Sequence, residues 1–138
     1  MITNMKQVAE RLNIAGIKPS VQRLAIMNYL MNHKTHPTVE EIYAALSPEI
    51  PTLSKTTVYN TLKLLTEHSA ILMLTIDEYC TRYDADISDH AHFICSSCGK
   101  VYDLEMPTIE NLKLDSDFQT NQLHLYVKGI CAKCRNMN

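Results

Sequence analysis

The sequence lacks any apolar run long enough to cross a membrane. A transmembrane helix needs about 20 consecutive apolar residues, and the longest runs here are far shorter. The 138 residues are 46% hydrophobic and 20% charged, which is the composition of a soluble globular protein with one ordinary domain or two small ones. No signal peptide precedes the chain, so we expect a cytoplasmic protein with no membrane partner.

The sequence also lacks an excess of positive charge. Residues 1 to 83 carry eight basic and seven acidic side chains, residues 84 to 138 carry five and eight, and the formal net charge is −2. Composition alone therefore argues against a nucleic-acid partner. An acidic protein can still bind DNA where its basic groups share one face, so that evidence has to come from the pattern of elements.

Four of the five cysteines form two C-x-x-C pairs, Cys95 with Cys98 and Cys131 with Cys134. Two thiolates at this spacing on a tight turn can enter one tetrahedral coordination sphere, and two such pairs complete a structural zinc site. Gly99 suits the first turn because glycine adopts a positive φ without steric cost. The sequence therefore predicts a four-cysteine zinc site that closes the second half of the chain around a small subdomain.

Two different roles for the paired cysteines remain open at this point. The pairs could form two disulfides, which the missing signal peptide disfavours. A thioredoxin-like redox pair would need a position between a strand and a helix of a βαβ unit, and neither pair has one. The odd cysteine, Cys80, is interpreted as a small buried apolar residue in a strand.

Apolar residues at three- and four-residue intervals predict four helices in the first half. Thr38 and Glu41 are spaced as a capping box, in which each side chain bonds the other residue's amide. Pro48 and Pro51 end that helix. The predicted segments are Met5 to Leu12 with Ile14, a helix opened by Pro19 and Ser20, one from Thr38 through Leu46, and Lys55 to His68 capped by Ser54.

Two β-prone runs, Ile71 to Ile76 and Tyr79 to Tyr83, follow the last helix and predict a hairpin. Helices followed by a hairpin are the plan of a winged helix-turn-helix domain, whose last helix enters the major groove. A merely solvated helix surface is the alternative, and exposed Tyr59 favours recognition. The expected DNA-binding residues are Arg23, Lys55, Thr56, Thr57, Tyr59, Asn60 and Lys63.

A second metal site is predicted just before the first cysteine pair. His90 and His92 alternate along a strand-like segment, so both imidazoles project from one face. The segment Lys100 to Asp103 can return as the antiparallel partner and bring Asp103 beside them, while Asp84 precedes them at loop distance. Nitrogen and oxygen ligands without sulfur suit Fe²⁺ or Mn²⁺.

These motifs together resemble the ferric uptake regulator family of bacterial metal-dependent repressors, from about Gly16 to Cys134. The matching segments are His36-Pro-Thr, Thr57-Val-Tyr-Asn-Thr-Leu, Asp89-His-Ala-His-Phe-Ile-Cys-x-x-Cys-Gly-Lys-Val-Tyr-Asp103, and Gly129-Ile-Cys-x-x-Cys134. The resemblance implies an α+β fold with an N-terminal winged helix-turn-helix domain at 1–83, a hinge at 84–89 and an α/β dimerisation domain at 90–138. It also implies a homodimer that binds double-stranded operator DNA.

The resemblance also implies a regulatory Fe²⁺ or Mn²⁺ site. Its ligands would be His36 from the first domain together with Asp84, His90, His92 and Asp103. A metal held by His36 would tie one domain to the other, and we expect it to favour one closed arrangement.

Within the family, the chain is most similar to the peroxide-sensing repressors. Where it has Asp103 and Asn60, iron-uptake repressors more often have Glu and Arg. Leu123 stands where many members have a histidine, and His124 is one step out of register. On a strand that single step turns His124 to the opposite face from Leu123, so a third metal site is not expected. The peroxide-sensor type implies oxidation of a ligand histidine, His36 or His90, and no enzymatic activity.

Three alternatives stay open at this stage. The first is a repressor that responds to iron or manganese without sensing peroxide. A zinc hydrolase could use the H-x-H segment with carboxylates and an open coordination position, but the sequence shows neither a substrate pocket nor a general base. A zinc-clipped interaction module is also conceivable.

Overall fold

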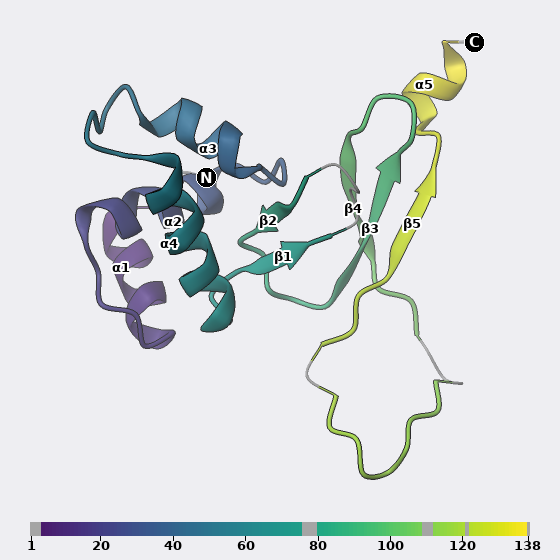
Figure 1. Ribbon diagram of the computed structural model, residues 1–138. Helices are drawn as coiled ribbons and strands as arrows, with labels where there is room; N and C mark the ends of the chain where they lie inside the picture. Colours follow the sequence, from purple (N-terminus) through teal and green to yellow (C-terminus); the bar gives the residue numbers. More distant parts are fainter. Residues whose placement is uncertain (1–3, 76–79, 109–111, 121, 138) are drawn as a thin grey trace. The chain divides into compact units, whose positions relative to one another are not determined.

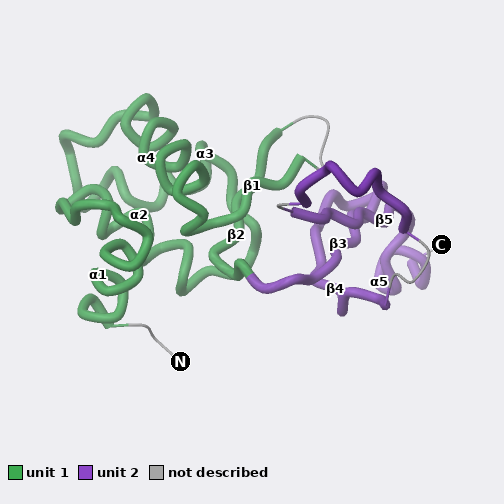
Figure 2. The backbone as a smooth tube through the Cα atoms, turned by 90° about the horizontal axis from the view of Figure 1, so that it is seen from below, with its two compact units in different colours: residues 1–87 green, residues 88–138 purple. Residues whose placement is uncertain are grey.

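The computed structural model describes residues 4–75, 80–108, 112–120 and 122–137. The chain forms two compact units, residues 1–87 and residues 88–138, which are coloured separately in Figure 2. The hinge expected at 84–89 stays a prediction.

The described residues of the first unit form four helices, and sequence signals explain where these helices begin. Ser20 and Ser54 each accept a hydrogen bond from the amide of the residue three positions later, so they cap the helices that follow. Gly16 takes a φ of 78° just after the first helix. The helices are α1 (Met5–Ile14), α2 (Val21–Asn32), α3 (Val39–Leu46) and α4 (Lys55–Glu67) (Figure 1).

Only half of the capping box predicted for α3 has formed. The Thr38 hydroxyl accepts from the Glu41 amide at 3.2 Å, as expected. The Glu41 carboxylate instead lies 3.9 Å from the guanidinium of Arg82. The prediction was wrong on this point because a distant positive charge competes with the local amide for the carboxylate.

The helices of the first unit pack around one apolar core. α1 contributes Leu12, α2 contributes Ile26 and α4 contributes Leu62, each with no exposed surface. Burying one such side chain stabilises the fold by about 1.5–3 kcal/mol. Val58 and Leu65 are buried on the same side of α4, which leaves its opposite side free for the polar residues.

A two-stranded antiparallel sheet completes the first unit. β1 (Leu72–Leu74) pairs with β2 (Arg82–Asp84), with Leu74 opposite Arg82. The strand pairing expected after α4 is confirmed, and the turn predicted at Asp77-Glu78 lies outside the described residues. Cys80 is half-buried and precedes β2, so its placement in a strand was wrong.

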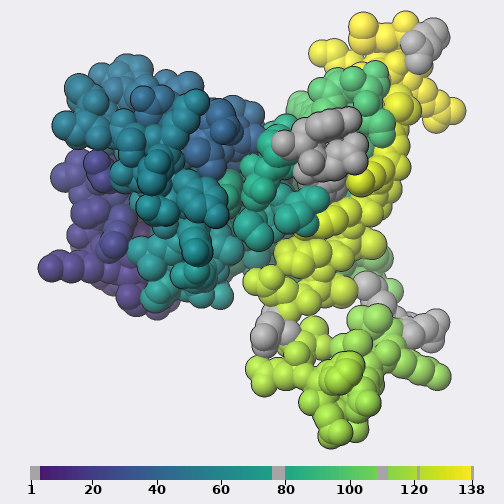
Figure 3. Space-filling model, viewed as in Figure 1, coloured from purple at the N-terminus to yellow at the C-terminus, as the bar shows by residue number. Residues whose placement is uncertain are grey.

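The second unit is built on a three-stranded sheet in the order β4-β3-β5. β3 (His90–Cys95) pairs antiparallel with β4 (Val101–Glu105) and parallel with β5 (Tyr126–Gly129), and a short helix, α5 (Ala132–Asn136), follows. The described residues between β4 and β5, which are 106–108, 112–120 and 122–125, lie outside this sheet (Figures 1 and 3). These described residues contain no helix. Within the described part of the expected α/β domain, α5 is therefore the helix.

None of the helices within the described ranges combines the length and apolar composition that crossing a bilayer requires.

Candidate metal centres and nucleic-acid interface

The four paired cysteines gather at one end of the second sheet. Their sulfur atoms all lie within 4.8 Å of one another, and the Cys98 and Cys131 sulfurs are 3.9 Å apart. Zn–S bonds of about 2.3 Å in a tetrahedron place sulfurs about 3.8 Å apart. The cluster therefore fits a zinc ion, and its cysteines are not joined as disulfides.

Strand pairing brings the two cysteine pairs together. β3 ends at Cys95, and its parallel pairing with β5 sets Cys95 opposite Gly129, two residues before Cys131. A Cβ added at Gly129 would lie 3.1 Å from the Phe93 ring, so this close approach favours glycine. Gly99 has a φ of 77°, as predicted, and its amide donates to the Cys95 carbonyl at 2.8 Å.

Backbone amides surround the sulfur of Cys95. The amides of Cys131 and Cys98 donate to it at 3.3 and 3.4 Å, and these hydrogen bonds lower the Cys95 pKa to about 6. The Cys134 amide likewise lowers the pKa of Cys131. The Cys131 sulfur accepts a hydrogen bond from the Cys134 thiol, which raises the Cys134 pKa to about 12. Four neighbouring thiolates repel one another, so the cluster needs a cation to be fully ionised.

Within the second unit, two histidines approach one carboxylate. Nε2 of His90 and Nε2 of His92 each lie 3.4 Å from Oδ1 of Asp103. β3 places both imidazoles on one face, with ring centroids 4.4 Å apart, and His92 is directly opposite Asp103 in the β3–β4 ladder. The predicted strand pairing is therefore confirmed. Nδ1 of His90 is 2.7 Å from the Ser88 carbonyl, so Nε2 is the ring nitrogen that faces Asp103.

Within the first unit, a further histidine meets a second carboxylate. Nε2 of His36 lies 3.4 Å from Oδ2 of Asp84, the last residue of β2. The other oxygen of Asp84 accepts from the Asp86 amide at 2.9 Å. The Tyr83 amide donates to the Pro37 carbonyl at 3.0 Å, so β2 binds the loop that carries His36.

Each unit thus carries imidazole nitrogens paired with a carboxylate oxygen. This donor set suits Fe²⁺ or Mn²⁺ better than a structural zinc ion. The structure brings His36 to Asp84 in one unit and His90 and His92 to Asp103 in the other. The assignment of all five to one regulatory ion stays a prediction.

Six of the seven predicted DNA-binding residues lie along the polar side of α4, whereas Arg23 lies in α2. Tyr59 is 52% exposed, which is high for a large aromatic side chain and supports a recognition surface. Thr57 is half-buried because its amide and hydroxyl both bond to the Ser54 hydroxyl at 3.0 Å. The exposed members of the predicted set on this helix are Lys55, Thr56, Tyr59, Asn60 and Lys63.

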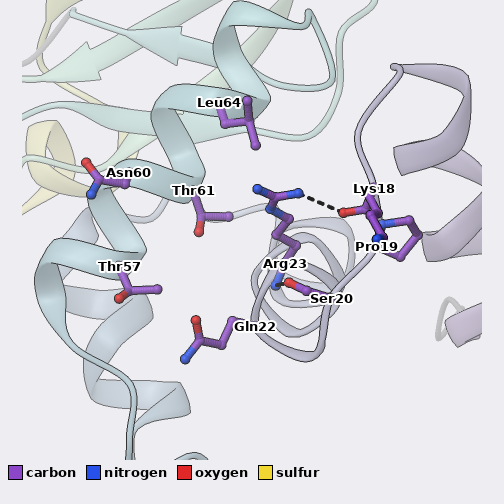
Figure 4. Close-up of a pocket in the computed structure, with 9 residues that line it drawn as sticks. All are labelled: Lys18, Pro19, Ser20, Gln22, Arg23, Thr57, Asn60, Thr61 and Leu64. Atoms are coloured by element: carbon purple, nitrogen blue, oxygen red, sulfur yellow. Dashed lines mark hydrogen bonds between the residues drawn. The ribbon is translucent and has the colours of Figure 1, made fainter.

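Two hollows flank these residues. A cavity of about 440 Å³ lies between α4 and the start of α2, and Arg23 lines it (Figure 4). Its guanidinium donates to the Lys18 carbonyl at 2.9 Å. A second hollow, on the Tyr59 side, is also lined by Lys55, Thr56 and Cys80. The full lining of the first cavity is Lys18, Pro19, Ser20, Gln22, Arg23, Thr57, Asn60, Thr61 and Leu64.

Sequence reasoning missed Lys18 and Gln22 as members of this surface. Both lie next to the predicted cap of α2, and that helix start was the available signal. The contact between α2 and α4 that completes the cavity has no local sequence signal.

The strand assumed at Leu123 and His124 has not formed, because β5 begins only at Tyr126. The prediction that the two side chains face opposite sides of a strand was therefore wrong. Nε2 of His124 is 3.0 Å from the Gln122 side-chain oxygen, and Nδ1 is 3.4 Å from the Tyr126 hydroxyl.

Comparison with known proteins identifies relatives over nearly the whole chain. The family described as "Ferric uptake regulator family" matches residues 14–128. The peroxide-responsive repressor PerR of Staphylococcus aureus (strain Mu50) is 35% identical over 129 residues, which cover 91% of this chain and 87% of that protein.

Solved structures agree with this result. The Helicobacter pylori ferric uptake regulator Fur, described as having three functional metal-binding sites, has a TM-score of 0.74 and 26% identity, with 97% of this chain and 95% of that chain covered. PerR from Streptococcus pyogenes, described in terms of peroxide sensing and gene regulation, has a TM-score of 0.54 and 27% identity, with 94% and 92% covered.

Proposed function

Because the chain belongs to the ferric uptake regulator family, we propose that it is a metal-dependent transcriptional repressor that binds operator DNA and senses peroxide. The observation that carries the metal-dependent part is the histidine–carboxylate contact of 3.4 Å present in each unit. The peroxide-responsive relatives support the finer assignment. The protein would act in the cytoplasm and as a regulator, without catalytic turnover.

The first unit would be the DNA-binding module. Its helices with the β1–β2 pair would form a winged helix-turn-helix domain, and α4 would enter the major groove with Tyr59 and Asn60 facing base edges. The cavity at the start of α2 would take a backbone phosphate, since Lys18 and Arg23 both line it. Lys55 and Lys63 would add further phosphate contacts.

The second unit would hold the structural zinc and form the homodimer. The four-cysteine cluster would bind Zn²⁺ and stabilise the ends of β3 and β5, which carry few other buried apolar groups. Leu104 and Val127 on the outer strands are 38% and 39% exposed. Apolar surface of this kind supports pairing with a second copy.

The regulatory ion would connect the two units. We assign it His36 and Asp84 from one unit and His90, His92 and Asp103 from the other. An ion that needs both sets of ligands binds best to one closed arrangement, so it shifts the population toward that arrangement. If the metal tightens DNA binding by some factor in this way, then by linkage bound DNA must tighten metal binding by the same factor.

Peroxide sensing would use the same ligands. Bound Fe²⁺ would supply the redox chemistry that breaks the O–O bond of hydrogen peroxide. One oxygen atom of the peroxide would form a C–O bond on the imidazole of His36 or His90 in place of a ring C–H bond. The displaced proton would join the other oxygen, which leaves as water, and the ring would lose the two electrons that the peroxide gains. The oxidised ring ligates poorly, so its unit is released from the shared ion.

The experiment is an operator-DNA binding assay on the zinc-loaded protein with Fe²⁺ or Mn²⁺, each before and after a low dose of hydrogen peroxide. Mass spectrometry of the His36 and His90 peptides follows. We expect binding to be lost only in the iron sample, together with one added oxygen on a histidine. Metal-dependent binding that survives peroxide in both samples would leave an iron- or manganese-responsive repressor. Absence of metal-dependent DNA binding would contradict the proposed function.

A further inference from the structure

The backbone of the first unit is strained at His36. Its φ is 57°, in the left-handed region that residues other than glycine seldom adopt. His36 also precedes Pro37, and residues before proline favour extended conformations with negative φ. Such strain persists only where surrounding contacts enforce it, and it is a recognised feature of functional positions.

Arg82 supplies a contact at the strained residue itself. Its Nη1 donates to the His36 carbonyl at 3.1 Å, and the Glu41 carboxylate lies 3.9 Å from the same nitrogen. Glu41 is half-exposed, so this ion pair adds little by itself and serves chiefly to orient the guanidinium.

The position of Arg82 in β2 links both ligands of this unit. Arg82 begins the strand that ends at Asp84, and the residue between them, Tyr83, bonds the Pro37 carbonyl. The strand therefore holds the loop at the carbonyls of His36 and Pro37, which belong to two consecutive peptide groups. Releasing the His36 carbonyl would let the loop relax toward negative φ and move the imidazole away from Asp84.

We propose that Arg82 is a positioning residue for the regulatory metal, which acts by holding His36 in the conformation that keeps its imidazole beside Asp84. The inference rests on the proposed function, which assigns His36 as a ligand of the regulatory metal. Arg82 itself binds no metal. Removing a group that orients a metal ligand weakens metal affinity by about 10- to 100-fold.

The test measures Mn²⁺ binding to the full-length, zinc-loaded protein without DNA, by the electron paramagnetic resonance signal of free Mn²⁺. We expect Arg82→Ala to raise the Mn²⁺ dissociation constant by about 10-fold or more. Arg82→Lys, which can still donate to the His36 carbonyl, should recover part of the affinity. Lys34→Ala is the matched control, because it removes an exposed positive charge from the same loop and should leave the constant unchanged.

A double-mutant cycle separates positioning from general effects. If Arg82 acts through His36, Arg82→Ala should weaken Mn²⁺ binding in the parent protein but add no further loss to His36→Ala. An equal loss in both backgrounds would show that Arg82 acts by charge or by general stability, and would overturn the inference. Unchanged affinity in Arg82→Ala would also overturn it. A parent protein that binds no Mn²⁺ at all would overturn the proposed function as well.

Discussion

Nε2 of His36 and Oδ2 of Asp84 lie 3.4 Å apart, although one belongs to the loop after α2 and the other ends β2. The contact lies entirely within the first unit. Two ligands are therefore already paired on one side of the proposed metal site, and the ion has fewer groups to order there.

The first prediction concerns His36 as the ligand that couples metal to DNA. His36→Ala should raise the Mn²⁺ concentration needed for half-maximal DNA binding by at least about tenfold, because one of the two proposed ligands in the first unit is lost. Titration of Mn²⁺ in a DNA-binding assay measures this concentration. His33→Ala is the control, since His33 is exposed and its Nδ1 contacts the Tyr29 carbonyl. If both substitutions raise the required Mn²⁺ concentration equally, His36 is not the ligand that couples metal binding to DNA binding.

The second prediction concerns the zinc cluster. Cys98→Ser should abolish tight zinc binding and lower the free energy of unfolding of the second unit by more than about 4 kcal/mol, because the metal would link the end of β3 to the segment that follows β5. Cys80→Ser should leave the zinc content at its parental value. Elemental analysis and thermal unfolding provide the two readouts. Retention of zinc by Cys98→Ser would contradict the assignment of four cysteine ligands.

The third prediction separates the stability of α4 from its role in DNA binding. Ser54→Ala removes the cap of α4 and should cost about 1 kcal/mol. Ser54→Asp should keep that stability, because aspartate caps a helix equally well and complements its dipole. The added negative charge should nevertheless weaken DNA binding through repulsion of the phosphates. Denaturant unfolding and DNA titration compare the two variants, and full DNA affinity in Ser54→Asp would place the start of α4 away from the duplex.

The fourth prediction concerns the number of phosphate contacts. Lys63→Ala should reduce the slope of log affinity against log salt by about one, because one counterion fewer is released on binding. Lys6→Ala in α1 should leave the slope unchanged. DNA affinity at several salt concentrations measures both slopes. If the Lys63 variant keeps the parental slope, Lys63 makes no phosphate contact.

Local signals in the sequence determined much of the fold. Helix starts at Ser20 and Ser54 were predictable because a capping side chain bonds an amide only three residues away. The shared face of His90 and His92 followed from the two-residue period of a strand. The zinc cluster was also predictable, since the spacing within each C-x-x-C pair is enough to form half of a tetrahedral site.

Only the tertiary structure decided the contacts between distant segments. Arg82 and Tyr83 in β2 donate hydrogen bonds to the carbonyls of His36 and Pro37, and no residue near His36 in the sequence indicates these bonds. Arg82 also lies beside the carboxylate of Glu41, which does not form the predicted bond to the Thr38 amide. Contacts of this kind depend on which distant polar groups the packed chain brings together. Helix caps and strand faces instead depend on the spacing of residues along the chain. The sequence by itself therefore determined the kinds of ligand, and the fold determined how each unit pairs them.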